Sequence, residues 1–547
     1  MTTFLPGIAR RAGANLSRVG RQVAARAVLG RRAPFWLLLR LAPPFEEAAG
    51  PRLPFTRPRG PSLLAALRAL GAAASDPRVA GVMLRFAGAP HGFAAAASLR
   101  RGVDAVRAAG KPVAAYGEAL QQAEYLVASG ADRLWLPETG SIQLVGLRSE
   151  ALFVSRLLER LSLKPDVVRV GSHKSAGEMF TRRAMSQQAR EQTETLLDDL
   201  LGTLIDAIAA GRRLDASVVR GLVDRGPYRA ETACEAGLAD GVRYPDQIEE
   251  ALAEWVPASA ETRPGDATPR VRLVDVGAYA SLHAHDAGFA PWLREQPRIA
   301  YVVAQGAIRR RGPGGISVEA LTRVLRQIGA QDAVRALVLR IESPGGDAMA
   351  SDLLWRALTV VKRDRPLVVS MGEVAASGGY FAAVAADAIF AEAPTLTGSI
   401  GVVGGKLDAG AALEKLGIDT DAVERGHRAG LLSAVRGFTP EERTVVRADM
   451  EAIYDVFARR VGEGRKLDRA AVEAVAQGRV WSGRRAHEHG LVDAIGGPLE
   501  AIGEARARAG IATHERVALQ VFPRIAPLGA MRALFGIEAR ADLGVGS

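Results

Sequence analysis

The stretch Met371-Gly-Glu-Val-Ala-Ala-Ser-Gly-Gly-Tyr380 organises the interpretation of the whole chain. The apolar run 366–371 predicts a buried strand, and the small residues from Ser377 to about 386 predict a helix. In such a strand–turn–helix, the two glycines let the backbone turn tightly and a substrate approach the Ser377 hydroxyl. The unpaired N–H groups of the helix N-terminus favour developing negative charge. The stretch is a candidate for a serine nucleophile, although Ser-Gly-Gly also forms ordinary turns before helices.

The composition is that of a globular protein. The chain has 547 residues, of which 48% are hydrophobic and 24% are charged. The net charge of +11 comes mostly from arginines that are scattered among acidic residues. Because no basic-aromatic cluster is present, we do not expect nucleic-acid binding. The single cysteine, Cys234, excludes an intramolecular disulfide.

Residues 1–59 are predicted to form a basic N-terminal arm. No acidic residue precedes Glu46, and apolar residues recur at helical spacing among arginines from position 8 to position 23. This pattern is typical of an amphipathic helix on an anionic membrane surface, and the alternative is a disordered basic tail. The apolar run 35–39 is too short for a membrane span, which needs about 20 residues. It also lacks the cleavage site of a secretory signal.

The body of the chain contains an internal repeat. Strands alternate with helices from about residue 60, which predicts a parallel sheet covered by helices, and the same order returns from residue 297. Residues 81–85 match 336–340, 140–142 match 398–400, and 171–177 match 424–430. We therefore predict an α/β protein with two homologous domains. The expected boundaries are 60–256 for the first domain, 257–296 for a linker, 297–525 for the second domain and 526–547 for a tail.

The two copies differ at the positions that carry chemistry. Ser377 aligns with Gln122, and Lys174 aligns with Arg428. Arginine is not deprotonated in proteins, whereas lysine acts as a base once burial lowers its pKa. In isolation, Lys174 would be interpreted as a surface lysine. The complementary losses instead predict one composite site, in which the first copy supplies the amine and the second supplies the hydroxyl.

The histidines offer neither a rival base nor a metal site. His173 and His427 flank the Lys174 and Arg428 positions in both copies, which is typical of scaffold residues. The His-x-His pairs at 283 and 487 lack a third ligand at metal-binding spacing. We therefore expect no metal and no cofactor.

Four motifs together resemble a known family. They are similar to those of the S49 serine protease family, in the long two-domain form of bacterial signal peptide peptidase A, and the similarity covers about residues 60–510. The motifs are Gly171-Ser-His-Lys-Ser-Ala176, Glu342-Ser-Pro-Gly-Gly346, Ala375-Ala-Ser-Gly-Gly-Tyr380 and Leu396-Thr-Gly-Ser-Ile-Gly401.

The resemblance implies tandem ClpP/crotonase-like domains and a Ser–Lys dyad. Carried over by position, the resemblance implies that Ser377 is the nucleophile, Lys174 is the general base and Ser399 orients the lysine. It also implies that the backbone N–H groups near Gly346 and of Gly378 form the oxyanion hole. An unprotonated lysine would accept the hydroxyl proton as an acyl-enzyme forms. Each oxyanion donor lowers the barrier by about 3 kcal/mol.

The resemblance also implies substrates, assembly and location. The expected substrates are remnant signal peptides or other short apolar or unfolded peptides, and the expected assembly is a homotetramer. The location would be the bacterial inner membrane, with the side left open because no clear transmembrane helix is found. The alternatives are a crotonase-type acyl-CoA enzyme and a non-catalytic membrane-associated scaffold. The sequence leaves open whether Lys174 serves its own chain or a neighbour.

Overall fold

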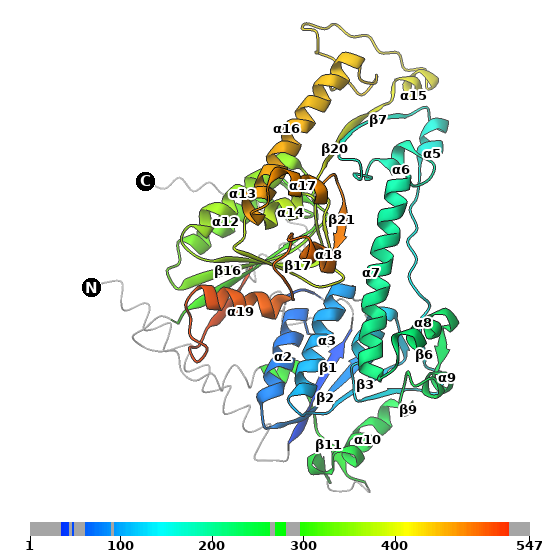
Figure 1. The fold of residues 1–547 in the computed structure, drawn as a ribbon, viewed down its shortest axis with the longest axis vertical. Coiled ribbons are helices and arrows are strands. Elements are labelled where there is room, and N and C mark those ends of the chain that lie inside the picture. Colours follow the sequence, from blue (N-terminus) through cyan, green and yellow to red (C-terminus); the bar gives the residue numbers. More distant parts are fainter. Residues whose placement is uncertain are drawn as a thin grey trace, which may run out of the picture. The chain divides into compact units, whose positions relative to one another are not determined.

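The computed structural model describes residues 34–42, 46–48, 61–88, 92–262, 268–280 and 296–523 (Figure 1). The expected amphipathic helix of the arm and the expected tail lie outside these residues. Within the described ranges, every helix is too short or too polar to cross a bilayer.

The chain divides into two compact units whose boundaries differ from those of the sequence repeat. The first unit comprises Met1–Val145, Ala207–Val303 and Ile511–Ser547, and the second comprises Gly146–Asp206 and Ala304–Gly510. A segment of the first sequence copy, residues 146–206, therefore belongs to the second unit. The predicted boundary at 256 separates the repeats in the sequence, but it does not separate the compact units.

The first unit is built on a six-stranded sheet. Its order is β12-β1-β2-β3-β5-β9, and all neighbours in it are parallel. Its strands are β1 (Phe35–Leu41), β2 (Val79–Phe86), β3 (Val113–Gly117), β5 (Arg133–Leu136), β9 (Gly241–Val242) and β12 (Leu273–Asp275). Shorter strands are β4 (Ala119–Leu120), β6 (Ser141–Ile142), β8 (Tyr228–Arg229), β10 (Ala260–Glu261) and β11 (Arg270–Val271). The helices are α2 (Leu63–Ser75), α3 (Phe93–Ala108), α4 (Gln122–Ala128), α8 (Ala216–Arg225), α9 (Ala230–Glu235) and α10 (Ile248–Trp255).

The strand β1 corrects the interpretation of the apolar run 35–39. This run was assigned to the arm, but it pairs in parallel with β2 and with β12 inside the sheet. Trp36, Leu37 and Leu39 are fully buried. A parallel strand that is covered on both faces is apolar throughout, so it lacks the alternation that marks a strand with one exposed face. The predicted linker is also structured where it is described, because it supplies β10, β11 and β12.

The second unit has β17 at the centre of its sheet. β16 and β18 flank β17 in parallel, and β19 also pairs with its carboxyl-terminal half. The strands are β16 (Val334–Ser343), β17 (Leu367–Ala376), β18 (Ala388–Ala391), β19 (Leu396–Gly398), β21 (Val480–Ser482) and β22 (Ala494–Ile495), with the short β14 (Ile308–Arg309) and β15 (Ile316–Ser317). The chain enters this unit within β13 (Arg298–Gln305), which pairs with β23 (Ala518–Phe522).

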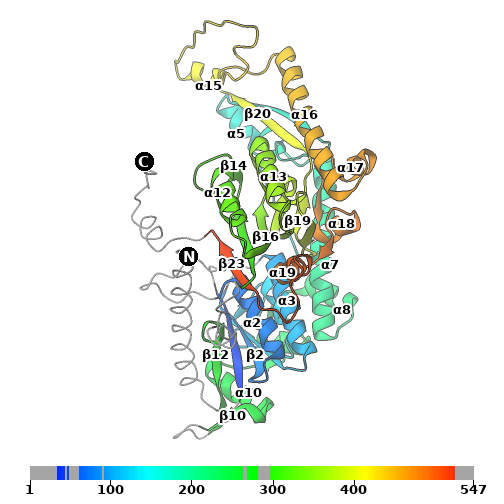
Figure 2. The ribbon, with the colours of Figure 1, turned by 90° about the vertical axis from the view of Figure 1, so that its left-hand side faces the viewer.

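Helices surround this sheet, and α12 and α13 lie side by side (Figure 2). The helices of the second unit are α5 (Ser155–Arg160), α6 (Glu178–Thr181), α12 (Val318–Gly329), α13 (Ala348–Lys362), α14 (Gly378–Ala383), α15 (Gly410–Lys415), α16 (Pro440–Arg465), α17 (Arg469–Val475), α18 (Gly483–Glu488) and α19 (Pro498–Arg508). The long helix α7 (Gln187–Arg212) begins in this unit.

A two-stranded ribbon joins the two sequence copies within the second unit. β7 (Lys164–Val170), from the first copy, pairs antiparallel along its whole length with β20 (Val402–Asp408), from the second copy. The two strands lie side by side in Figure 1. Lys174 follows β7 and Ser399 precedes β20, so the ribbon brings both residues to the same end.

Candidate active site

Ser377 occupies the turn between β17 and α14. Its backbone has φ +53° and ψ −120°, a conformation that non-glycine residues rarely adopt. Hydrogen bonds hold it there, because the Ser377 N–H donates to the Gly398 carbonyl at 2.8 Å and the Phe381 N–H donates to the Ser377 carbonyl at 2.9 Å. A strained backbone that its surroundings enforce is common at functional sites.

Lys174 is buried beside this hydroxyl. Its Nζ lies 3.1 Å from Ser377 Oγ, and it donates to Ser399 Oγ at 2.9 Å and to the Ser399 carbonyl at 2.7 Å. Only 5% of Lys174 is exposed, and this burial lowers the pKa of its amine to about 8. At pH 7 roughly a tenth of such amines are neutral, compared with less than a thousandth at the ordinary lysine pKa. The three side chains predicted from the sequence therefore meet within one compact unit.

Glycines bring the turn after β16 against the Ser377 turn. A Cβ added at Gly345 would lie 2.7 Å from Ser377 Cβ and 2.8 Å from the Gly378 nitrogen. Gly345 also has φ +103°, so a side chain there would be strained as well as crowded. Within the described part of the chain, neither Gly346 nor Gly378 donates its N–H to a protein acceptor. Both N–H groups are therefore available as backbone donors, Gly378 directly after Ser377 and Gly346 directly after Gly345.

Glu342, near the end of β16, is hydrogen bonded to β17 just before the Ser377 turn. Its carboxylate accepts hydrogen bonds from the Glu373 N–H at 2.5 Å and the Val374 N–H at 3.2 Å. These bonds fall where the pairing of β16 with β17 shifts register, between Ile341 and Ser343. Glu342 therefore supplies acceptors to β17 where the regular ladder is interrupted.

The positions that align with Ser377 and Lys174 lie in different compact units. Gln122 begins α4 in the first unit, whereas Arg428 belongs to the second unit. Arg428 is exposed and forms an ion pair with Glu441 at 3.3 Å. Among the described residues, no group of three or more histidine, cysteine, aspartate or glutamate side chains is arranged to hold a metal ion.

Residues 476–479, which connect α17 to β21, were not identified from the sequence. The His173 N–H donates to the Gln477 carbonyl at 2.8 Å, and the Ser399 N–H donates to the Arg479 carbonyl at 2.6 Å. These residues contact Ser399 and the neighbour of Lys174 through backbone atoms. The only local signal in the sequence is Gly478, an ordinary turn residue.

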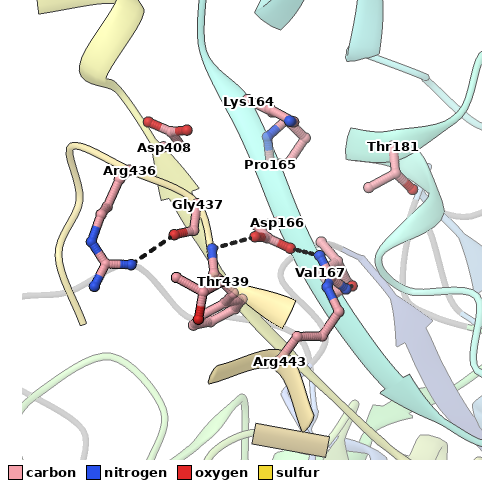
Figure 3. A pocket seen from close by; sticks show the side chains of 11 residues that line it. Lys164, Pro165, Asp166, Val167, Thr181, Asp408, Arg436, Gly437, Thr439 and Arg443 are labelled. Carbon is pink, nitrogen blue, oxygen red and sulfur yellow. Dashed lines mark hydrogen bonds and ion pairs between the residues drawn. The ribbon is translucent and has the colours of Figure 1, made fainter. Parts of the chain in front are cut away.

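A charged cavity of about 400 Å³ lies at the opposite end of the β7–β20 ribbon (Figure 3). Its lining includes Lys164 at the start of β7 and Asp408 at the end of β20. The Asp166 carboxylate accepts from the Phe438 N–H at 2.7 Å and pairs with Arg443. These contacts join β7 to the start of α16. The residues that line the cavity therefore hold the β7–β20 ribbon in place and are not part of the Ser377–Lys174 site.

Comparison with known proteins identifies the family. The model of peptidase family S49 matches residues 105–258 and again residues 359–512. The chain is 34% identical over 454 residues to "Serine protease SPPA, chloroplastic" of Arabidopsis thaliana, covering 82% of this chain and 66% of that protein. It is 31% identical over 410 residues to "Protease 4" of Salmonella typhi, covering 73% and 64%. It is 30% identical over 475 residues to "Protease 4" of Haemophilus influenzae, covering 82% and 73%.

The chain belongs to peptidase family S49. It carries the S49 domain twice, which confirms the tandem repeat predicted from the sequence. The matched region spans 66% and 64% of the first two relatives, slightly under two thirds of their length. A ClpP1 mutant from Listeria monocytogenes superposes with a TM-score of 0.26 at 14% identity, over 37% of this chain and 94% of that one, which is too limited to bear on the fold.

Proposed function

We propose that the protein is a serine endopeptidase in which Ser377 is the nucleophile and Lys174 is the general base. The observation that carries the proposal is the 3.1 Å distance between Lys174 Nζ and Ser377 Oγ. A hydroxyl is a weak nucleophile unless a base lies within hydrogen-bonding reach. A lysine with a pKa of about 8 is such a base near neutral pH. Both residues belong to one chain, which favours catalysis within a single protomer.

The proposed reaction begins with proton transfer from Ser377 Oγ to the neutral Lys174 amine. The oxygen attacks the carbonyl carbon of the scissile bond and forms a tetrahedral oxyanion. The N–H groups of Gly346 and Gly378 bind this oxyanion, and each contributes about 3 kcal/mol if it acts as such donors commonly do. The Lys174 ammonium then protonates the leaving amine. Lys174 next takes a proton from the water that hydrolyses the acyl-enzyme.

Ser399 is proposed to orient the base. Its hydroxyl and its carbonyl oxygen both accept from Lys174 Nζ. Two fixed acceptors leave the Lys174 amine little freedom to rotate away from Ser377. A third direction on the nitrogen then points at the Ser377 hydroxyl, which is the geometry required for proton transfer.

The proposed substrates are short apolar or unfolded peptides, with remnant signal peptides as the physiological class. One relative, from Enterococcus faecium, is named "Putative signal peptide peptidase SppA" and is 36% identical over 173 residues. The assay should use unfolded apolar peptides, with a crotonyl thioester as the contrasting substrate. Peptide cleavage that disappears in Ser377→Ala supports the proposal. Hydration of the thioester without peptide cleavage would favour the acyl-CoA alternative, and neither activity would favour the scaffold.

A homo-oligomer is proposed from the pairing pattern of the repeat. The repeat aligns residues 404–408 of β20 with 146–150, and β7 with 417–423. β7 and β20 pair with each other, whereas the aligned segments 146–150 and 417–423 form no strand. Val423, at the end of the second segment, is 83% exposed, and Leu152, two residues after the first segment, is 80% exposed. The same pairing between two chains would join segment 417–423 of one protomer to segment 146–150 of the next. A homotetramer, as the resemblance implies, is our expectation.

We propose that the N-terminal arm contacts a membrane surface through residues 8–23. The proposal is supported by the sequence, in which apolar residues recur at helical spacing among arginines and no acidic residue precedes Glu46. Binding to anionic vesicles that falls with rising salt is the expected result. Equal sedimentation of the protein with anionic and neutral vesicles would contradict it.

A further inference from the structure

The turn formed by residues 476–479 is hydrogen bonded to the segment that carries Ser399. The Ser399 N–H donates to the Arg479 carbonyl at 2.6 Å, and the Gly478 N–H donates to the Ile400 carbonyl at 2.7 Å. Ser399 itself has φ +51°, a conformation that is unfavourable without such restraints. The turn therefore fixes the backbone of Ser399, whose carbonyl oxygen and side-chain hydroxyl accept hydrogen bonds from Lys174 Nζ.

The same turn contacts the Lys174 segment from its other side. The His173 N–H donates to the Gln477 carbonyl at 2.8 Å. A Cβ added at Gly478 would lie 2.7 Å from both Cα and Cβ of Lys174. Backbone and Cβ atoms do not move aside as the end of a flexible side chain does. Gly478 therefore allows the turn to approach Lys174 closely, and its φ of +80° also favours glycine.

The side chain of Gln477 anchors the turn to two helices. Its Nε2 donates to the Tyr454 hydroxyl at 3.2 Å and to the Glu473 carboxylate. Tyr454 on α16 is buried, and its hydroxyl donates to Glu473 on α17 at 2.7 Å. Gln477 has φ +56°, so these contacts hold a backbone conformation that glutamine rarely adopts.

We propose that the 476–479 turn sets the geometry between Lys174 and Ser377, with Gln477 and Gly478 as positioning residues. This inference rests on the proposed function. The turn bonds on one side to Ser399 and on the other to the residue before Lys174. Displacing it changes the distance between the amine and its acceptors without touching Ser377 or the substrate. A misplacement of about 1 Å lowers the rate of such reactions by about 100-fold.

The test compares Gly478→Ala with Gly110→Ala. Gly110 has φ +77° and nothing within 4 Å of an added Cβ, so its variant carries the same backbone strain without a collision. We expect Gly478→Ala to lower kcat for peptide hydrolysis by about 100-fold with KM within about twofold. The pKa of the rising limb of its pH profile moves upward from about 8, because a displaced amine regains solvent. If the two variants have the same kcat and the same pKa for the rising limb of the pH profile, the inference is overturned.

Gln477→Ala provides the second variant, because Gly478→Ala risks failing to fold. It removes the anchor to Tyr454 and Glu473 and the hydrogen bond that Gln477 Oε1 accepts from the Ser172 N–H at 3.4 Å. We expect about tenfold lower kcat with the same upward shift of the pKa of the rising limb. A wild-type kcat together with an unchanged pKa of the rising limb in Gln477→Ala would contradict a positioning role. An inactive wild-type protein would instead overturn the proposed function, so the two failures are distinguishable.

Discussion

Lys174 Nζ lies closer to the Ser399 carbonyl oxygen, at 2.7 Å, than to the Ser377 hydroxyl oxygen, at 3.1 Å. A carbonyl only accepts, so it always binds a hydrogen of the amine, in either protonation state. The Ser399 hydroxyl can donate as well as accept, but its own distance of 2.9 Å fits a hydrogen received from Lys174. The neutral amine then has its lone pair free for the proton of Ser377. In the proposed mechanism, this order of contacts directs the lysine base at one hydroxyl.

The pH dependence follows from the burial of Lys174. Burial lowers the pKa of its amine to about 8, and only the neutral form accepts a proton. We expect kcat/KM to rise tenfold per pH unit below about pH 7 and to level off above about pH 9. Stopped-flow or fluorogenic peptide assays across pH 5–10 measure this profile. A flat profile over this range would exclude a lysine base with this pKa.

The same burial should make the stability of the protein depend on pH, with the free energy of unfolding rising as the pH increases. The pKa of Lys174 is lower in the folded state than in the unfolded state, so the cost of burying the ammonium is full below pH 8 and absent above about pH 10.5. Lys174→Met removes that cost, which is at most about 3 kcal/mol. We expect a higher unfolding temperature for the variant at pH 7 and a gap that closes toward pH 10.5. A variant less stable than wild type at pH 7 would contradict this reasoning.

Gly345→Ala tests the close approach of the two turns. The new methyl group would meet Ser377 Cβ and the Gly378 nitrogen, so we expect at least about 100-fold lower kcat in a folded protein. Gly490→Ala is the matched control, because Gly490 has φ +71° and open space around an added Cβ. Circular dichroism monitors folding in both. Equal activity of the two variants would show that the Gly345 contact is dispensable.

The oligomer proposal predicts which exposed apolar residues matter. Val423→Asp and Leu152→Asp place a charge beside the segments expected to pair between protomers, so each should shift the protein toward monomers. Val218→Asp is the control, since Val218 is 47% exposed on α8, away from those segments in the sequence. Light scattering coupled to size exclusion measures the mass. A mass unchanged in Val423→Asp and Leu152→Asp would place any interface elsewhere.

Much of the secondary structure follows from local patterning. The strand predicted for the apolar run 366–371 corresponds to the first part of β17, because a short apolar run that leads into turn signals is typical of a buried strand. The run 35–39 was misassigned because a strand buried on both faces has no alternation, and its position behind the basic arm pointed to membrane contact. Its burial depends on β12, which lies more than 200 residues later in the sequence.

The candidate site was predictable because the repeat supplies an internal comparison. Gln122 opposite Ser377 and Arg428 opposite Lys174 indicate which positions are candidates for the chemistry. The repeat does not indicate which compact unit the segment 146–206 joins, because the pairing of β7 with β20 decides that. The role of the turn at Gln477 could not be predicted from the sequence, since its contacts with His173 and Ser399 are backbone hydrogen bonds that no side-chain pattern encodes.

The most direct test of the account is the site of covalent modification by a fluorophosphonate, mapped by mass spectrometry in wild type, Ser377→Ala and Lys174→Ala. Such reagents phosphonylate an activated serine hydroxyl. We expect one adduct on Ser377 in wild type, none in Ser377→Ala, and labelling slowed by at least about 100-fold in Lys174→Ala. An adduct on another serine, or labelling of Ser377 at the wild-type rate in Lys174→Ala, would contradict it.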